Sequence, residues 1–68
     1  MRKKTICIIF GGISVEHEVS IISANSILNN IDFKHYRPIG LYLTKKGGFR
    51  YCKIINKSGK KQFLPQAY

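Results

Sequence analysis

The first hydrophobic run of the chain lies close to its amino terminus. Residues 4–10, KTICIIF, are almost continuously apolar, and the run stops at the pair Gly11-Gly12. A continuous run of this length is typical of a strand buried on both faces, as in a parallel sheet. The two glycines allow a sharp turn or a close backbone approach. We therefore predict a buried strand over 4–10, followed by a tight turn.

The pattern then changes to a helical period. Over residues 15–31 the apolar side chains cluster on two sides of a helix and leave a narrow polar stripe between them. The stripe consists of Glu18, Asn25 and Asn29. Ser14 is a suitable N-cap, because its hydroxyl can accept a hydrogen bond from the first turn, and the asparagines at 29–30 are a stop signal. We expect a helix this apolar to be covered on more than one side.

Two further strands are predicted after the helix. Residues 37–44, RPIGLYLT, form the first, with Pro38 at its beginning or on an edge because proline cannot donate to a ladder. The glycines at 47–48 favour a hairpin into a third strand near 49–55. NKSGKK is a further turn, and the tail QFLPQAY shows no clear period.

Strand, glycine turn, helix and strand together form a βαβ unit. Its two strands are expected to be parallel, with a right-handed crossover. We predict an α/β fold over 1–68, a single Rossmann-like unit with parallel strands and a small hairpin. In open parallel sheets, ligands bind beyond the carboxyl ends of the strands, which places a candidate site at residues 11–20.

The length of 68 residues limits the chain to one small domain, which would bury only about 60% of its unfolded surface. Cys7 lies in an apolar run and Cys52 in an aromatic one. We expect two reduced, largely buried thiols, as in a cytosolic protein, rather than a disulfide. There is no CxxC pair and no Cys/His cluster, so a structural zinc site is not expected.

Charge is the strongest feature of the composition. The formal net charge is +9, with 12 Lys and Arg against 3 Asp and Glu. Such an excess attracts nucleic acid, phosphates or acidic surfaces, or it is a solvated basic face of part of a larger, better balanced protein. The apolar part of MRKKTICIIFGG is too short for a signal peptide, and no segment is long enough to span a bilayer. We expect a cytoplasmic protein with no membrane contact.

The candidate chemistry follows the glycine turn, where Glu16 and Glu18 flank His17. GGISVEHE is neither a GxGxxG fingerprint nor a Walker loop. The carboxylates can simply stabilise the helix through its dipole. Alternatively, a Glu can bind an ammonium group while main-chain N–H groups and the hydroxyl of Ser14 or Ser20 bind a carboxylate, which would suit an amino acid.

The two histidines do not identify an enzyme by themselves. His17 can act as a general acid or base, or it can orient the turn. No nucleophile–base–orienter set can be completed from these residues. His35, beside Tyr36 in a loop, is expected to be structural.

The segment IIFGGISVEHEVSIISANSIL closely resembles the amino-terminal segment of the D-alanine–D-alanine ligases, whose first strand ends in Gly-Gly-x-Ser-x-Glu-His-x-Val-Ser. YRPIGLYLTKKGGFRY resembles the next strand and turn of that family. The resemblance covers residues 4 to about 51. Ile13 and Phe49 depart mildly from it, since family members often carry a polar residue and a Trp there, and the tail after Lys53 matches nothing known to us.

These ligases are ATP-grasp enzymes of cell-wall peptidoglycan synthesis, which join two D-alanines through an acyl phosphate. The resemblance implies that this chain is their amino-terminal part and supplies the first D-alanine site. It implies that Glu16 holds the ammonium, as the catalytic residue of this segment, and that Val19 lines the methyl pocket. Gly11, Gly12 and Ser20 would shape the turn. Relatives that make D-alanyl-D-lactate or D-alanyl-D-serine, which underlie vancomycin resistance, share the segment, so the second substrate stays open.

Other parts of the family pattern are missing from these 68 residues, namely the His-Gly-x-x-Gly-Glu motif, the ATP-grasp lysines and the residues that hold magnesium. The resemblance therefore implies ATP and Mg²⁺ for the full-length enzyme, but no cofactor or metal site here, and we expect the chain alone to be inactive. It also implies a homodimer through this domain. The alternative is a stand-alone basic module that binds nucleic acid or another polyanion through Arg50, Tyr51 and Lys53, although no known nucleic-acid motif supports it.

Overall fold

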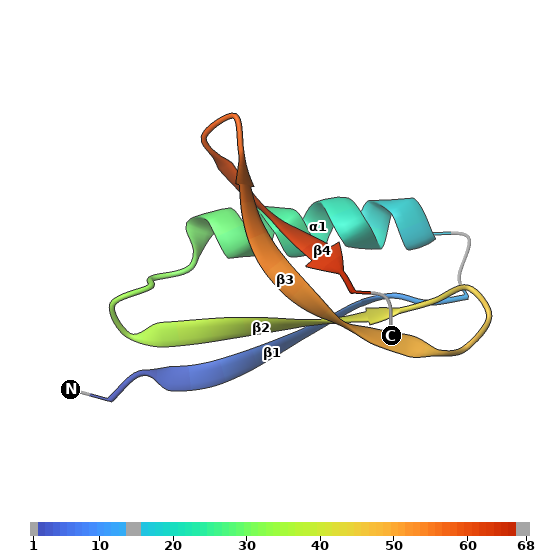
Figure 1. The fold of residues 1–68 in the computed structure, drawn as a ribbon, viewed down its shortest axis with the longest axis horizontal. Coiled ribbons are helices and arrows are strands. Elements are labelled where there is room, and N and C mark those ends of the chain that lie inside the picture. Colours follow the sequence, from blue (N-terminus) through green and yellow to red (C-terminus); the bar gives the residue numbers. More distant parts are fainter. Residues whose placement is uncertain (1, 14–15, 67–68) are drawn as a thin grey trace.

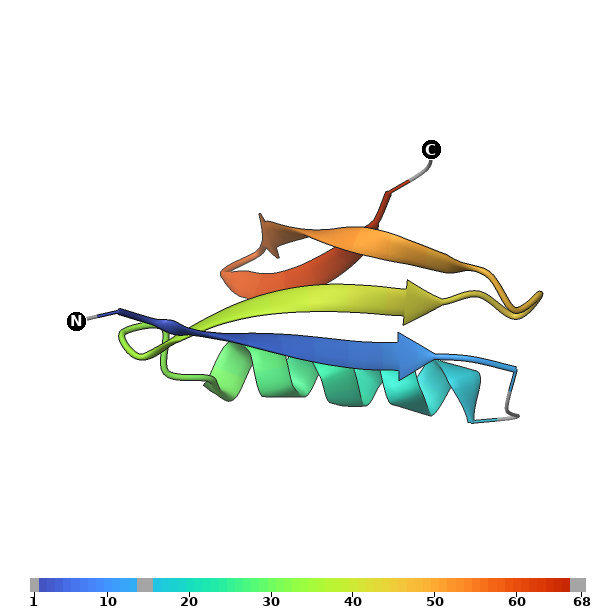
Figure 2. The ribbon, with the colours of Figure 1, turned by 90° about the horizontal axis from the view of Figure 1, so that it is seen from below.

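The computed structural model describes residues 2–13 and 16–66. These residues form a four-stranded sheet with one helix packed against it (Figures 1 and 2). The elements, in chain order, are β1 (Lys4–Gly11), α1 (His17–Asn30), β2 (Tyr36–Leu43), β3 (Phe49–Lys57) and β4 (Lys60–Pro65). The sheet order is β1-β2-β3-β4, in which β1 and β2 are parallel and the other pairs antiparallel. The predicted α/β fold with parallel strands and a hairpin is confirmed.

The β1–β2 pair places the end of β1 beside the start of the helix. Its register runs without interruption from Lys4↔Tyr36 to Gly11↔Leu43. Pro38 lies near the beginning of β2, before the register with β3 starts at Gly40↔Cys52, so its missing N–H interrupts no bond to β3. Figure 2 shows α1 running along β1, with the start of α1 and the end of β1 at the same end of the molecule.

Only one face of β1 is covered, so the prediction of burial on both faces was wrong. Ile8 and Phe10 are buried under α1, whereas Cys7 is exposed and Ile9 is 60% exposed. In the described part of the chain the helix lies on one face of the sheet, and no element covers the other (Figures 1 and 2). The continuous apolar run of the sequence therefore marks a strand with two apolar faces, of which one is open.

The cysteines agree with part of their prediction. Both are free thiols, as expected, but Cys7 lies on the open face of the sheet and is not buried. Cys52 is partly buried, and this burial raises the pKa of its thiol.

Two hairpins connect the later strands. The predicted turn at Gly47-Gly48 is confirmed: Gly47 has φ +92°, and the Gly48 N–H donates to Thr44 Oγ1 at 3.0 Å. The second hairpin has Ser58 (φ +52°) and Gly59 (φ +80°) between the paired Lys57 and Lys60. Two consecutive positive φ values in a two-residue loop are the type I′ geometry, which suits the twist of antiparallel strands.

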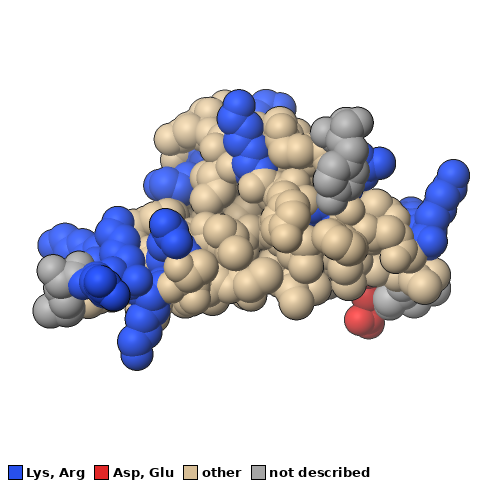
Figure 3. All heavy atoms as spheres, turned by 60° about the horizontal axis from the view of Figure 1, so that its bottom comes forward, with Lys and Arg blue, Asp and Glu red and all other residues tan. Residues whose placement is uncertain are grey.

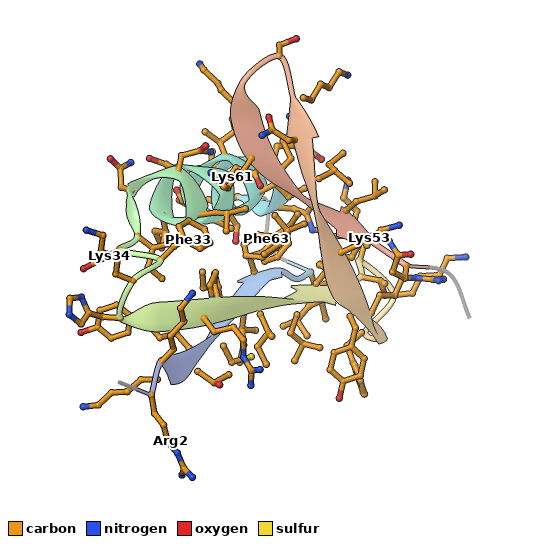
Figure 4. The ribbon with its side chains drawn as sticks, turned by 60° about the vertical axis from the view of Figure 1, so that its left-hand side comes forward. Arg2, Phe33, Lys34, Lys53, Lys61 and Phe63 are labelled. Carbon is orange, nitrogen blue, oxygen red and sulfur yellow. The ribbon has the colours of Figure 1, made fainter. Side chains whose placement is uncertain are left out.

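Strand β4 lies in the tail for which no strand was predicted, and it completes the core. Phe63 of β4 is buried and stacks on Phe10 of β1, with the ring centroids 5.5 Å apart. Its ring lies directly over Gly40 of β2, where a Cβ atom would come within 2.5 Å of it. Figure 4 shows Phe63 between the sheet and the helix. The core consists of Ile8, Phe10, Ala24, Leu28 and Phe63.

Helix α1 spans residues 17–30, somewhat less than the predicted 15–31. Ser14, the predicted N-cap, lies outside the described residues, and Glu16 occupies the N-cap position. The helix buries Ala24 and Leu28 against the sheet, but Ile22 and Ile27 are exposed. The expected second cover is therefore absent among the described residues.

The predicted polar stripe of the helix holds the edge of the sheet. Asn25 Oδ1 accepts the Phe63 N–H at 3.0 Å, and Asn29 Oδ1 accepts the Lys61 N–H at 2.9 Å. Since β4 is an edge strand, these amides occupy backbone groups that a neighbouring strand would otherwise bond. The two asparagines of the stripe therefore fix β4 against α1, a role that the helical pattern alone did not indicate.

Candidate functional site

The glycine turn joins the end of β1 to the start of α1. Gly11 and Gly12 have φ values of +93° and +98°, in the region that favours glycine. The Gly12 N–H donates to the Leu43 carbonyl at 2.8 Å, and the Gly11 N–H donates to Ser20 Oγ at 2.9 Å. A Cβ atom on Gly11 would lie 2.5 Å from the Leu43 carbonyl oxygen. The turn therefore has room for glycine only at position 11, and it is tied to both β2 and α1.

An open pocket of about 380 Å³ lies at this turn. It is lined by Gly11, Glu16, Val19, Ser20 and Ser23. Four of the five predicted site residues thus meet in one pocket, and the fifth, Gly12, lies in the adjoining turn. Ser23 was not among the predicted residues, although it follows Ser20 at the three-residue spacing that brings helix side chains to one face. Whether this pocket binds D-alanine stays a prediction.

The pocket combines an acidic group with an apolar wall. Glu16 is exposed at the N-cap position, and Val19 is 59% exposed although it is apolar. Ser20 Oγ accepts the Gly11 N–H and still has an O–H to donate. Chemically, these groups can bind an ammonium, a small alkyl group and a hydrogen-bond acceptor.

The two glutamates that flank His17 have different surroundings. Glu16 lines the pocket, whereas Glu18 lies 3.7 Å from the Lys45 ammonium of the β2–β3 loop. Both partners of that ion pair are exposed, so its contribution to stability is small. Of the two carboxylates, only Glu16 lies where a ligand in this pocket could reach it.

His17 is almost completely buried, with 3% of its surface exposed. Its Nδ1 lies 2.6 Å from the Gly12 carbonyl oxygen, and its Nε2 lies 2.8 Å from the Tyr42 hydroxyl. Because a carbonyl can only accept, Nδ1 carries the hydrogen, and in the neutral ring Nε2 accepts from the Tyr42 O–H. Both ring nitrogens are therefore engaged within the protein, which favours orientation of the turn over proton transfer.

His35 lies far from the pocket in the loop between α1 and β2. Its Nδ1 contacts Asp32 Oδ2 at 2.5 Å, and Asp32 Oδ1 accepts the Lys34 N–H at 2.9 Å. The hydrogen bond from His35, followed by that from Lys34, lowers the pKa of the Asp32 carboxyl. This arrangement closes the loop and agrees with the structural role expected for His35.

Basic residues gather at the end of the sheet opposite the pocket. The group comprises Arg2, Lys3, Lys4, Lys34 and Arg37, close to the amino ends of β1 and β2. Figure 3 shows the concentration of Lys and Arg at this end, and Figure 4 shows Arg2 and Lys34 there. This group of basic residues is therefore separated from the pocket along the length of the molecule, although Lys45 lies beside Glu18 at the pocket end.

The residues of the predicted polyanion module are not brought to one face. Arg50, Tyr51 and Lys53 lie on β3, where successive side chains point to opposite sides of the sheet. Tyr51 and Lys53 share one side, and Arg50 points to the other, where its guanidinium donates to the Gln66 carbonyl at 3.3 Å. This geometry does not favour the nucleic-acid alternative.

Within residues 2–13 and 16–66, no group of three or more His, Cys, Asp or Glu side chains is placed to hold a metal ion. In the same part of the chain, no helix is long and apolar enough to cross a membrane.

Comparison with known proteins identifies a family that matches this chain. A family model for the amino terminus of D-alanine–D-alanine ligases matches residues 5–67. Two proteins named D-alanine–D-alanine ligase, from Chlorobium luteolum and Chlorobium phaeovibrioides, are 45% identical over 49 residues and 47% identical over 47 residues. These matches cover 72% and 69% of this chain, but only 14% and 13% of those ligases, so the chain spans about one seventh of their length.

A solved structure shares the fold. The VanG D-Ala:D-Ser ligase from Enterococcus faecalis matches with a TM-score of 0.70 and 25% sequence identity. The match covers 82% of this chain and 22% of the VanG chain. Fold and sequence thus point to the same group of proteins.

Proposed function

The chain belongs to the family of D-alanine–D-alanine ligase amino-terminal segments, and we propose that it forms the part of such a ligase that binds the first D-alanine. One observation carries the proposal: Glu16, Val19 and Ser20 line a single pocket at the end of β1. Alanine offers an ammonium, a methyl group and a carboxylate, and the pocket has a complementary group for each.

The proposed roles follow from the positions of the side chains. Glu16 holds the ammonium, because its carboxylate is the acidic group that lines the pocket. Val19 contacts the methyl group with its exposed apolar surface. Gly11, Gly12 and Ser20 shape the turn, and the O–H of Ser20 can donate to the carboxylate of the ligand.

Ligation itself is proposed for a longer polypeptide that carries this segment. The matched segment is only about one seventh of the relatives' length, and GGISVEHE is not a phosphate-binding loop. No metal-ligating cluster occurs among the described residues, so we assign ATP and Mg²⁺ to other parts of such an enzyme. The function of the whole would be the ATP-dependent joining of two D-alanines, or of D-alanine with a related partner. This reaction would take place in the cytoplasm and supply peptidoglycan synthesis. A homodimer through this domain is part of the same proposal.

The proposal is tested by titrating the 68-residue chain with D-alanine while amide resonances are followed by NMR. We expect D-alanine to shift the resonances of Gly11, Ser20 and Ser23, and L-alanine to shift them less. Glu16→Gln should abolish the effect, because the neutral amide no longer balances the ammonium. Glu18→Gln is the matched control and should bind normally, since Glu18 pairs with Lys45 and does not line the pocket. Equal binding by the Glu16→Gln variant and the unmodified chain would refute the assignment.

A further inference from the structure

We infer that Tyr42 is a positioning residue for the pocket, although it does not line it. Its hydroxyl holds the buried ring of His17, and that ring holds both the glycine turn and the first turn of α1. The ligand in this inference, D-alanine, rests on the proposed function. The geometry of the link is independent of it.

Within the glycine turn, Gly12 is held by hydrogen bonds rather than by packing. A Cβ atom on Gly12 would meet nothing within 4 Å, so no neighbouring side chain confines this residue. Its N–H donates to the Leu43 carbonyl, and its own carbonyl accepts from His17, which in turn contacts Tyr42. Both polar groups of Gly12 are therefore tied to consecutive residues at the end of β2, one directly and one through His17.

The same link fixes the start of the helix. His17 is the first residue of α1 and directly follows Glu16, which lines the pocket. Its ring meets the ring of Tyr42 edge-on, with the centroids 5.4 Å apart and an interplanar angle of 80°. Because side chains leave a helix at fixed angles, a fixed ring at position 17 determines where Val19 and Ser20 point. The rotation of the first turn, and hence the shape of the pocket, depends on this contact.

Tyr42 offers a way to remove the link without removing the packing. Its ring lies 5.7 Å from that of Phe10 and beside Gly11, and a phenylalanine ring would keep both contacts. Only the hydroxyl would be lost in Tyr42→Phe. The Nε2 atom of the buried His17 would then lack its partner, which favours a tilt of the ring.

The experiment compares Tyr42→Phe with Tyr51→Phe in the 68-residue chain. Tyr51 is 62% exposed on β3 and pairs with Leu41, so its side chain lies on the other face of the sheet from Tyr42 and offers the same chemical change there. We measure the ¹⁵N resonances of the His17 ring, the amide resonances of Gly11, Gly12 and Ser20, and the dissociation constant for D-alanine. Tyr42→Phe should remain folded, shift the His17 nitrogens and the turn amides, and weaken D-alanine binding about three- to tenfold, as the loss of one hydrogen bond implies. Tyr51→Phe should change none of these.

The readouts separate the two claims. If D-alanine binds the unmodified chain and Tyr42→Phe alters neither the affinity nor the His17 resonances, the positioning role is refuted and the proposed function stands. If D-alanine does not bind the unmodified chain, the proposed function fails, and the turn amides decide the positioning role. Unchanged amides of Gly11, Gly12 and Ser20 in Tyr42→Phe would then refute it, and displaced amides would support it.

Discussion

Asn29 on α1 binds the main chain of Lys61 on β4 at both polar groups. Its Oδ1 accepts the Lys61 N–H at 2.9 Å, and its Nδ2 donates to the Lys61 carbonyl at 2.8 Å. The same Nδ2 donates to the Asn25 carbonyl at 2.7 Å, so every hydrogen-bonding group of the amide is used. The Lys61 ammonium lies 5.0 Å from the centre of the Phe33 ring, as Figure 4 illustrates. A side chain thus replaces a neighbouring strand at this edge.

Asn29→Ala should destabilise the chain, because it leaves the polar groups of Lys61 without their partner. We expect a loss of about 1–3 kcal/mol in the free energy of unfolding, measured by urea denaturation. Asn30→Ala is the control: Asn30 Nδ2 donates only within the helix, to the Ser26 carbonyl at 2.7 Å. Equal effects of the two substitutions would show that the contact with β4 adds nothing to stability.

Gly40→Ala should also destabilise the chain. The new methyl carbon would lie 2.5 Å from Cδ1 and 2.7 Å from Cε1 of Phe63, a core ring with little room to move. Overpacking of this kind costs about 1–3 kcal/mol, which thermal unfolding would detect. Gly48→Ala is the control, since its Cβ would meet only Thr44 Oγ1 at 3.4 Å. A Gly40→Ala variant as stable as the unmodified chain would mean that Phe63 does not lie over β2.

The loop carboxylate Asp32 should make stability depend on pH in the acid range. Its pKa is lowered in the folded chain, chiefly by the hydrogen bond from His35, so the folded state binds a proton less readily than the unfolded state. The stabilisation is therefore complete above the unfolded pKa of about 3.9 and is lost as the pH falls through the folded value. Thermal midpoints between pH 7 and pH 2 should fall less steeply for Asp32→Asn. An unchanged slope would argue against this contribution.

The 68-residue chain should release no phosphate from ATP when D-alanine and Mg²⁺ are present. The reason is the lack of a phosphate-binding loop and of a metal-ligating cluster among its described residues. A coupled phosphate assay measures this, with a full-length D-alanine–D-alanine ligase as the positive control. D-alanine-dependent phosphate release by the purified chain would refute the expectation.

Local patterns predicted the first strand, the helix, the second strand and the Gly47-Gly48 hairpin, because each carries a period or a turn signal of its own. Local patterns did not predict the elements that depend on contacts with residues distant in the sequence. Strand β4 has little alternation and ends at Pro65, and the amides of Asn25 and Asn29 hold it in place. The turn at NKSGKK was predicted and contains the Ser58-Gly59 pair of the second hairpin, but no strand was predicted after it. Likewise, an apolar run such as 4–10 shows what a strand could bury and not whether a second layer is present.

In the candidate site, too, the residues close in sequence were predicted and the distant one was not. Its residues Gly11, Glu16, Val19 and Ser20 are close in sequence, so the motif and the helical period brought them together. Tyr42 lies 25 residues after His17 in the chain. It reaches the turn only because the parallel register pairs Gly11 with Leu43, and no local pattern reports that register.

The parallel register also has a consequence for the order of folding. Partners in β1 and β2 are 32 residues apart, whereas a two-residue loop joins β3 and β4. Closing a long loop costs more chain entropy than closing a short one, so the hairpins should form before β1 docks. The pocket lies at the end of β1 and would assemble in the last step. In quenched-flow hydrogen-exchange labelling during refolding, protection of the Gly12 amide should therefore appear after that of the β3–β4 amides, so that only the completely folded chain offers a place for the ligand.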